Sequence, residues 1–274
     1  MAEPRNQFRR RIFLAAVMVV VSLCSPATGL LRAQERTAIQ GFWSTDFTVP
    51  DHPEWRIEDH FCEITCPSIA RQHLRSLLAN PANDSRPLQE LWREANQAAN
   101  KYVAELMTDA ARERRTRYDP AADPVIRCEP PHLIMLVLAP PPIAIEVHDD
   151  HVIIHHEYWN TVRTIRIADQ IASSVEGSSR LGSSTARFEG ATLIVESRNL
   201  AGFTPQIQTL TTTDGTRTVE RYTASSNGGR LDLELTIDDP ASYREPLVLT
   251  QSRVRTPDER ILALPPCEVI SGQP

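Results

Sequence analysis

The sequence predicts a mainly β protein of the α+β class, in which an N-terminal helical segment precedes an antiparallel meander. Across a proline-rich boundary at 120–142, the hydrophobic period changes from helical to alternating. The alternating segments that follow are separated by turn residues and not by helices, as in a meander. Nine strands are expected, and a flat sheet of nine strands would leave its edges exposed, so we expect a barrel-like or strongly curved sheet.

The chain opens with the features of an export signal: a basic start, an apolar run of twelve residues, and small residues after it. That run is too short to span a bilayer. Arg10 and Arg11, just before it, also fit the twin-arginine pattern of proteins exported in the folded state. We expect cleavage after Ala27 or Ala33, so that 1–33 is the signal peptide and the mature chain is periplasmic or secreted, without a membrane span.

Removal of the signal makes the chain strongly acidic. It takes away five arginines and one glutamate and leaves a net charge of about −10. Such a chain is poorly suited to phosphate backbones or anionic membrane surfaces, because like charges repel. We therefore expect a small-molecule ligand or substrate and no nucleic-acid partner, and the sequence leaves the oligomeric state open.

Four cysteines remain in the mature chain: Cys62, Cys66, Cys128 and Cys267. An even number in an exported protein favours disulfides, and four cysteines allow three pairings. Cys62 and Cys66 can pair with each other, and Cys128 and Cys267 would then join the middle of the chain to its tail. A thiolate metal site or a catalytic thiol is the alternative, but no second cysteine pair or nearby histidine pair completes a zinc pattern. We expect disulfides and no cofactor.

The segment 34–130 is expected to hold one strand followed by helices. The stretch "GFWSTDFTV" at 41–49 predicts the strand, and "PSIARQHLRSLLAN" carries apolar residues at helical spacing up to Pro81. Residues 87–115 predict one long amphipathic helix, whose apolar stripe is expected to pack on the core. The prolines that follow separate this segment from an antiparallel β domain at 131–274.

Nine strands are expected in the β domain, each a short alternating run bounded by turn residues such as "DD", "EG", "DG" and "NGG". Their ranges are 143–148, 151–158, 162–167, 184–188, 191–198, 204–212, 217–224, 230–237 and 246–254.

The stretch "EVHDDHVIIHHEYW" at 146–159 gathers four histidines on one predicted hairpin. A turn at the two aspartates places His148 opposite His151. The side-chain period of two puts apolar residues and His156 on one face, and five ionisable residues on the other: Glu146, His148, His151, His155 and Glu157. The residues at the tip could bind a divalent ion, whereas His155 stands too far along the strand to join them easily. We favour a solvated turn and predict no metal site.

Ionisable side chains also occupy one face of other expected strands. If these faces turn inward, Glu157, Arg163, Glu220 and Glu234 form a buried acid-base array with shifted pKa values. If the faces turn to water, the same residues form salt bridges that contribute little stability. Polar residues are usually exposed, so the second arrangement is favoured.

Several motifs resemble those of a functionally uncharacterised family of exported bacterial proteins. "LGSSTARFEGATLIVESRNL", "TVERY" and "LTIDDPASYREPL" are similar to the family's GxSxGRWEGDTLVV, VVERF and TIEDP patterns, and the resemblance covers roughly residues 120–267. The positions that carry the family's residue types are Gly182, Ser184, Arg187, Glu189, Gly190, Thr192, Glu220, Arg221, Asp239 and Pro240. The resemblance implies a periplasmic β-rich domain and no established reaction.

This chain departs from the family pattern at polar positions. Ser183 stands for the usual histidine, Ala186 for a glycine, Phe188 for a tryptophan, Ala191 for an aspartate, and Thr212 and Thr213 for the pair HS. If those residues carry an activity in typical members, this chain has lost or changed it. The "GFW" at 41–43 also resembles the Gly-x-Trp opening of lipocalin-like barrels.

The function favoured by these features is binding of a small, partly apolar molecule, because barrels with mixed linings enclose such ligands. Tyr158, Glu189 and Tyr222 are the candidate ligand-binding residues. An interaction protein that presents the long helix to a periplasmic partner is one alternative.

The other alternative is an acid-base enzyme, an isomerase, cyclase or hydrolase. In this case one carboxylate acts as acid or base and an arginine stabilises developing negative charge. The candidate catalytic residues are Glu157, Arg163, Glu220, Arg221 and Glu234.

Overall fold

The computed structural model describes residues 36–46, 48–49, 52–56, 68–119, 121, 127–168, 177–204 and 210–268. The expected export signal and the expected pairing of Cys62 with Cys66 lie outside these residues.

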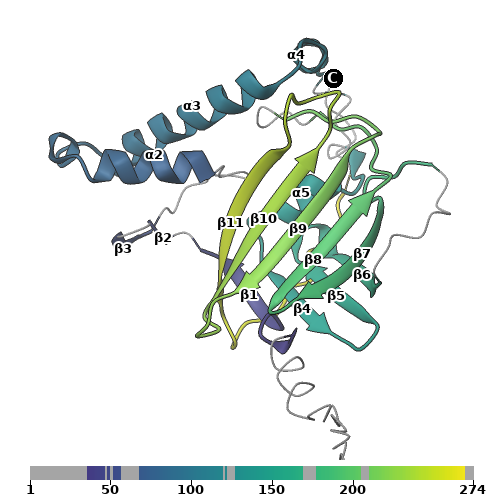
Figure 1. Cartoon of the computed structure of the whole chain (residues 1–274). Coiled ribbons are helices and arrows are strands. Elements are labelled where there is room, and N and C mark those ends of the chain that lie inside the picture. The colour runs from purple at the N-terminus through teal and green to yellow at the C-terminus, as the bar shows by residue number, and fades with distance from the viewer. Residues whose placement is uncertain are drawn as a thin grey trace, which may run out of the picture.

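Nine strands form a closed barrel, so the fold class predicted from the sequence is confirmed (Figure 1). Around the barrel the order is β1, β11, β10, β9, β8, β7, β6, β5 and β4, and β4 pairs with β1 to close it. The strands are β1 (Gly41–Thr45), β4 (Ile143–Val147), β5 (His151–His156), β6 (Thr161–Ile167), β7 (Ser183–Glu189), β8 (Thr192–Arg198), β9 (Arg217–Ala224), β10 (Arg230–Asp238) and β11 (Leu247–Arg255). The short strands β2 (Thr48–Val49) and β3 (His52–Arg56) pair with each other in a separate sheet.

The barrel departs from a simple antiparallel meander in two places. Strands β6 and β7 pair in parallel, through Arg166 with Thr185 and Ile167 with Ala186, and such a pair needs a longer connection than a hairpin, here 168–182. The expected strand at 204–212 lies mostly outside the described residues, and its described part makes only an isolated bridge between Phe203 and Thr212. The ninth strand is instead β1, from the segment before the helices, and its pairs with β4 and β11 remove the last sheet edges.

The long helix predicted at 87–115 is two helices, α3 (Leu88–Leu106) and α4 (Asp109–Thr116), preceded by α2 (Ser68–Leu78) and the 3₁₀ turn η1 (Pro81–Asn83). Thr108 separates α3 from α4. Its hydroxyl accepts a hydrogen bond from the Ala111 N–H, so Thr108 is the N-cap of α4. Its own N–H donates to the carbonyl of Ser242 at 2.9 Å. This contact with the loop after β10 turns the chain between the two helices.

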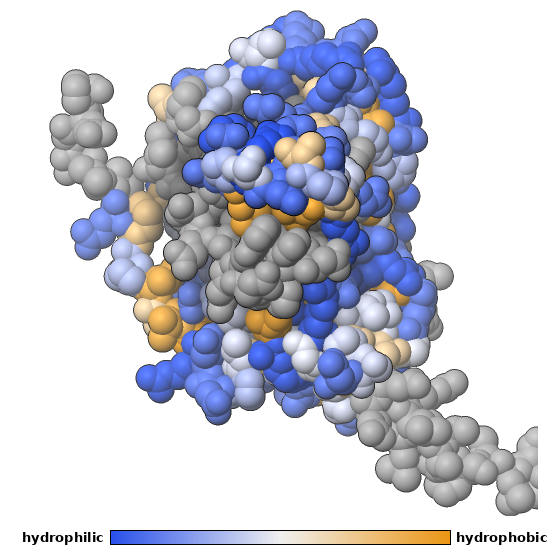
Figure 2. Space-filling model, turned by 90° about the vertical axis from the view of Figure 1, so that its left-hand side faces the viewer, coloured by the Kyte–Doolittle hydropathy of each residue, from blue (hydrophilic) through white to orange (hydrophobic). Residues whose placement is uncertain are grey.

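The apolar stripe of α3 is buried within the chain. Leu91, Trp92 and Ala95 pack with Leu74 of α2 in a small cluster, and Val103 farther along α3 joins the barrel core. Figure 2, which faces the tip of this helical hairpin, shows mostly polar residues on it and apolar residues at its underside. No helix among the described residues is long and apolar enough to cross a membrane.

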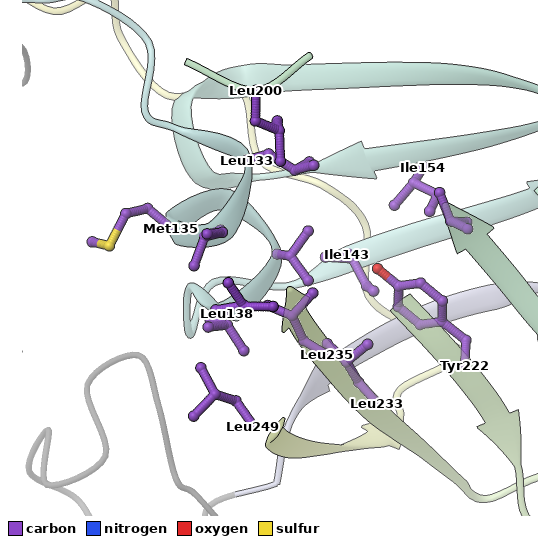
Figure 3. Close-up of a cluster of buried hydrophobic side chains, with 14 of the residues drawn as sticks. Leu133, Met135, Leu138, Ile143, Ile154, Leu200, Tyr222, Leu233, Leu235 and Leu249 are labelled. Carbon is purple, nitrogen blue, oxygen red and sulfur yellow. The ribbon is translucent and has the colours of Figure 1, made fainter. Parts of the chain in front are cut away.

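The helix α5 (Leu133–Leu138) was not predicted, and it packs at one end of the barrel interior (Figures 1 and 3). Its sequence LIMLVL is apolar on every side, and none of its residues is more than 8% exposed. A helix that is apolar all round must be enclosed on all sides, which the barrel provides. Figure 3 shows Leu138 beside Leu235 and Leu249 of the barrel wall. The chain therefore fills part of its own barrel.

The C-terminal tail is fastened across the barrel end. Cys267 forms a disulfide with Cys128, which confirms the expected link between the middle of the chain and the tail. Before this disulfide, the Leu264 N–H donates to the side chain of Asn160, in the 3₁₀ turn η4 (Tyr158–Asn160), at 2.9 Å. Because Cys128 lies five residues before α5, the disulfide also anchors the segment that leads into that helix.

Candidate functional site

The eight site residues predicted from the sequence divide into an inner and an outer group. Arg163, Glu220 and Tyr222 point into the barrel and are buried. The other five lie on or near the outer surface: Glu157, Tyr158, Glu189, Arg221 and Glu234. The prediction that polar strand faces are exposed is therefore right for β10, whereas β6 and β9 turn charged residues inward.

The inner group forms one ionic cluster. The Arg163 guanidinium donates to both carboxylate oxygens of Glu220, from Nη2 to Oε1 at 2.7 Å and from Nη1 to Oε2 at 2.9 Å. The Tyr222 hydroxyl donates to Oε2 of the same carboxylate at 2.6 Å. Burial opposes the positive charge of Arg163, but the charge and hydrogen bonds of Glu220 outweigh it and raise the pKa of Arg163. Burial raises the pKa of Tyr222 well above its ordinary value, so the phenol stays a donor.

This cluster leaves Glu220 little freedom as a base. Both of its oxygens already accept charge-assisted or phenolic hydrogen bonds from Arg163 and Tyr222. Arg163 also reaches the Ser184 hydroxyl, which is 2.7 Å from the hydroxyl of Ser197. The network thus spans β6, β7, β8 and β9 and holds its members in fixed positions.

A second buried cation, Arg253 on β11, was not among the predicted site residues. Its Nη1 donates to the carbonyl of Pro141 at 2.9 Å and its Nη2 to that of Ala139 at 2.8 Å. Gln251, on the same face of the strand, donates to the carbonyl of Leu138 at 3.0 Å. These carbonyls lie at and just beyond the end of α5, where no N–H of the helix can bond them. Burial lowers the pKa of Arg253 to about 10, and the Tyr222 hydroxyl opposes this lowering.

The alternation of β11 was the available signal for this pair. Gln251 and Arg253 are in phase with Leu247 and Leu249, which point to the core, and out of phase with the exposed Val248. A charged residue at an inward position of an amphipathic strand is unusual and indicates a candidate functional site.

His156 at the end of β5 is also inside the barrel, as the predicted face of its strand requires. Burial lowers the pKa of His156 well below its ordinary value, and the positive charges of Arg163 and Arg253 lower it further, while the backbone of Leu136 opposes them. The imidazole is therefore neutral near pH 7, and it lies within the electric field of both buried arginines.

Several buried polar atoms inside the barrel make no hydrogen bond of standard geometry to the described residues. They are both ring nitrogens of His156, Oγ1 of Thr218, Oε1 of Gln251 and Nε of Arg253. Roughly nine in ten buried polar groups in proteins have a partner, so such a concentration is uncommon. The barrel interior retains hydrogen-bonding capacity that its own side chains do not use.

The outer group makes solvent-exposed contacts. The Glu157 carboxylate accepts a hydrogen bond from the N–H of Leu262 in the tail. Arg221 pairs with Glu189 at 3.2 Å. Arg221 and Glu234 also line an open groove of about 340 Å³ on the outside of β9, β10 and β11, together with Thr223, Asp232, Thr250 and Ser252.

The histidine hairpin has the predicted register, with Val147 opposite Val152 and the rings of His148 and His151 stacked at 4.4 Å. We expected His155 to stand too far along the strand to join the residues at the hairpin tip, and for Glu146 this expectation is wrong. Glu146 lies diagonally across from His155, so its carboxylate comes within 3.0 Å of that ring and within 3.6 Å of His148. Within the described ranges, no three His, Cys, Asp or Glu side chains are placed to hold one metal ion.

Comparison with known proteins adds little to this geometry. No protein-family model and no curated protein matches the chain. One similar solved structure is the crystal structure of a mutant of the fluorescent protein UnaG, with 19% identity, a TM-score of 0.25, and coverage of 42% of this chain and 70% of that chain. A likeness at that TM-score carries no argument about ligand or mechanism.

Proposed function

We propose that this chain is an exported protein, periplasmic or secreted, that binds a small, partly apolar molecule inside its barrel. The observation that carries the proposal is the group of partnerless polar atoms on His156, Thr218, Gln251 and Arg253. A bound molecule, or water that it displaces, would supply the missing partners.

The lining around these atoms is suited to such a ligand. Small-molecule sites are mostly apolar, with a few polar groups that fix the orientation of the ligand. The inward residues of β4 and β10 are aliphatic, as are Val152 and Ile154 of β5, and the polar groups come from His156 of β5 and from β9 and β11. Figure 3 shows the Tyr222 ring among these aliphatic side chains, with its hydroxyl toward Ile143.

The two alternatives have less support from particular residues. For the acid-base enzyme, the buried carboxylate of Glu220 is fully engaged, and Glu157 and Glu234 lie outside the barrel. For the interaction protein, the apolar stripe of α3 is covered by α2 and the barrel core.

The test is native mass spectrometry of the protein purified from its own host. We expect a defined additional mass that is lost on denaturation, and a protein mass that lacks about the first 33 residues. Denaturing mass spectrometry of the same sample gives the length of the processed chain, so export is tested independently of binding.

A matched pair of variants locates the ligand. Leu235→Phe adds volume inside the barrel, and Thr236→Phe adds it on the outer face of the same strand. We expect the first to lose the bound mass and the second to keep it, because overpacking acts only where space is limited. A bare wild-type protein, or equal retention by both variants, would contradict binding inside the barrel.

A further inference from the structure

The buried charges in the barrel do not balance. Arg163 is neutralised by Glu220, with which it shares two hydrogen bonds. Arg253 is 0% exposed, and among the described residues no carboxylate lies within salt-bridge distance of it. Asp239, another buried carboxylate, follows β10 and is held by the hydroxyls of Thr213, Thr216 and Ser242. One positive charge inside the barrel, that of Arg253, therefore has no ionic partner in the part of the chain that the structure describes.

The groups that bond Arg253 only partly compensate for its burial. They are the neutral carbonyls of Ala139 and Pro141, and they satisfy two of the five N–H groups of the guanidinium. The end of a helix carries partial negative charge, but α5 has only six residues. The Nε atom of Arg253 stays buried without a partner. Burying a cation against neutral groups alone is costly, so the site favours the arrival of an anion.

The neighbours of Arg253 are suited to hold the same anion. Gln251 precedes it by two residues on the same face of β11, and the charge of Arg253 is felt by both His156 and Tyr222. A neutral imidazole donates from one of its nitrogens, and neither nitrogen of His156 makes a hydrogen bond of standard geometry to the described residues, although the backbone of Leu136 is close enough to raise its pKa. A second donor can thus assist the guanidinium without adding another charge.

We infer that the ligand carries one anionic group, such as a carboxylate, that binds against Arg253, and that the remainder of the ligand is apolar. This inference rests on the proposed function. Charge-assisted hydrogen bonds between arginine and a carboxylate are short and strong, and the pairing of Arg163 with Glu220 is the internal example in this barrel. A cationic ligand would be repelled, and a neutral ligand would leave the charge of Arg253 unmatched.

Two fluorescent dyes test the inference directly. 8-Anilino-1-naphthalenesulfonate and N-phenyl-1-naphthylamine have the same aromatic body, but only the first carries an anionic group. We expect the purified protein to bind the anionic dye at least about tenfold more tightly than the neutral one, since one neutralised buried charge is worth that much or more. Equal affinities for the two dyes would overturn the inference.

Two arginine variants show which cation is responsible. Arg253→Gln should weaken binding of the anionic dye about tenfold and change the neutral dye by less than about twofold. Arg221→Gln removes a guanidinium from the outer groove and should change neither dye. Arg253→Lys keeps a positive charge and should keep most of the preference for the anionic dye. If Arg253→Gln does not fold, as judged by circular dichroism, the inference is still tested by the preference of the wild type and of Arg253→Lys for the anionic dye over the neutral dye.

The outcomes separate the inference from the proposed function. Binding of both dyes with equal affinity, insensitive to Arg253→Gln, would leave a ligand-binding barrel without an anion site. Loss of the anionic preference in Arg221→Gln would place the anion in the outer groove and overturn the inference. Absence of binding by either dye, together with a bare protein in native mass spectrometry, would overturn the proposed function itself.

Discussion

Two ion pairs of the same chemical type lie on opposite sides of the barrel wall. Glu220 and Arg221 are consecutive residues of β9, yet Glu220 pairs with Arg163 inside and Arg221 pairs with Glu189 outside. The inner side chains are 4% and 0% exposed, and the outer ones are 39% and 50% exposed. One peptide unit thus separates an ion pair in a protein interior from an ion pair in water.

The comparison teaches that the surroundings, and not the residue types, set the role of such a pair. Inside, neither partner can be removed without leaving a charge that water does not reach. Outside, water and salt replace a lost partner at little cost. Arg253 is the intermediate case, since it is as buried as Arg163 but is bonded by carbonyls. For this reason we proposed the anion site at Arg253 and not at Arg163.

The largest expected effect comes from Glu220→Gln. The substitution keeps the size of the side chain but removes the charge that neutralises Arg163, so we expect a loss of about 3–5 kcal/mol in the free energy of unfolding. Urea denaturation followed by circular dichroism measures this change. A loss below about 1 kcal/mol would mean that water enters the cluster, and the inner pair would then resemble the outer one.

A triple variant tests whether the unpaired charge of Arg163 causes the loss of stability in Glu220→Gln. Replacing the whole cluster with apolar residues, as Arg163→Met, Glu220→Leu and Tyr222→Phe, removes both charges of the pair together and leaves neither of them buried without the other. Such replacements are often neutral or stabilising, so we expect the triple variant to be more stable than Glu220→Gln alone. If it is less stable, the cluster contributes more by its geometry than by charge compensation.

The next largest expected effect is a loss of stability in mild acid, which is caused by the buried histidines. Burial lowers the pKa of His132 to about 4, and the backbone of Ala201 opposes this. Between about pH 6.5 and pH 4 the unfolded chain binds a proton at this site that the folded protein does not, so stability falls as the pH falls. One such histidine accounts for about 3 kcal/mol over that range. The lowered pKa of His156 acts in the same direction.

The variant His132→Asn tests this assignment. Asparagine keeps an acceptor for the N–H of Ile134 at the start of α5 but does not titrate. We expect the variant to lose a fixed amount of stability at pH 8, from the lost stacking on Phe203, and to depend less steeply on pH below 6.5. A pH dependence as steep as that of the wild type would assign the acid sensitivity to other groups.

The sequence predicts the alternation of the strands well, because most of the strands have one apolar face. It correctly places Tyr222 and Glu220 on one side of β9 and Arg221 on the other, but it cannot say which side of a strand with two polar faces lies inside. That choice depends on barrel closure, which involves β1 from a distant part of the chain. The helix α5 was missed because six apolar residues between prolines give too short a pattern to distinguish a helix from a strand.

The smallest effect is expected for the outer pair, and it is the control for all the others. Arg221→Gln and Glu189→Gln should each shift the midpoint of thermal unfolding by less than about 2 °C, because both side chains remain solvated when separated. The double variant should show a coupling near zero, which a double-mutant cycle measures. A coupling comparable to that between Arg163 and Glu220 would mean that the outer groove excludes water. The groove would then be a second buried site, and the contrast across β9 would not hold.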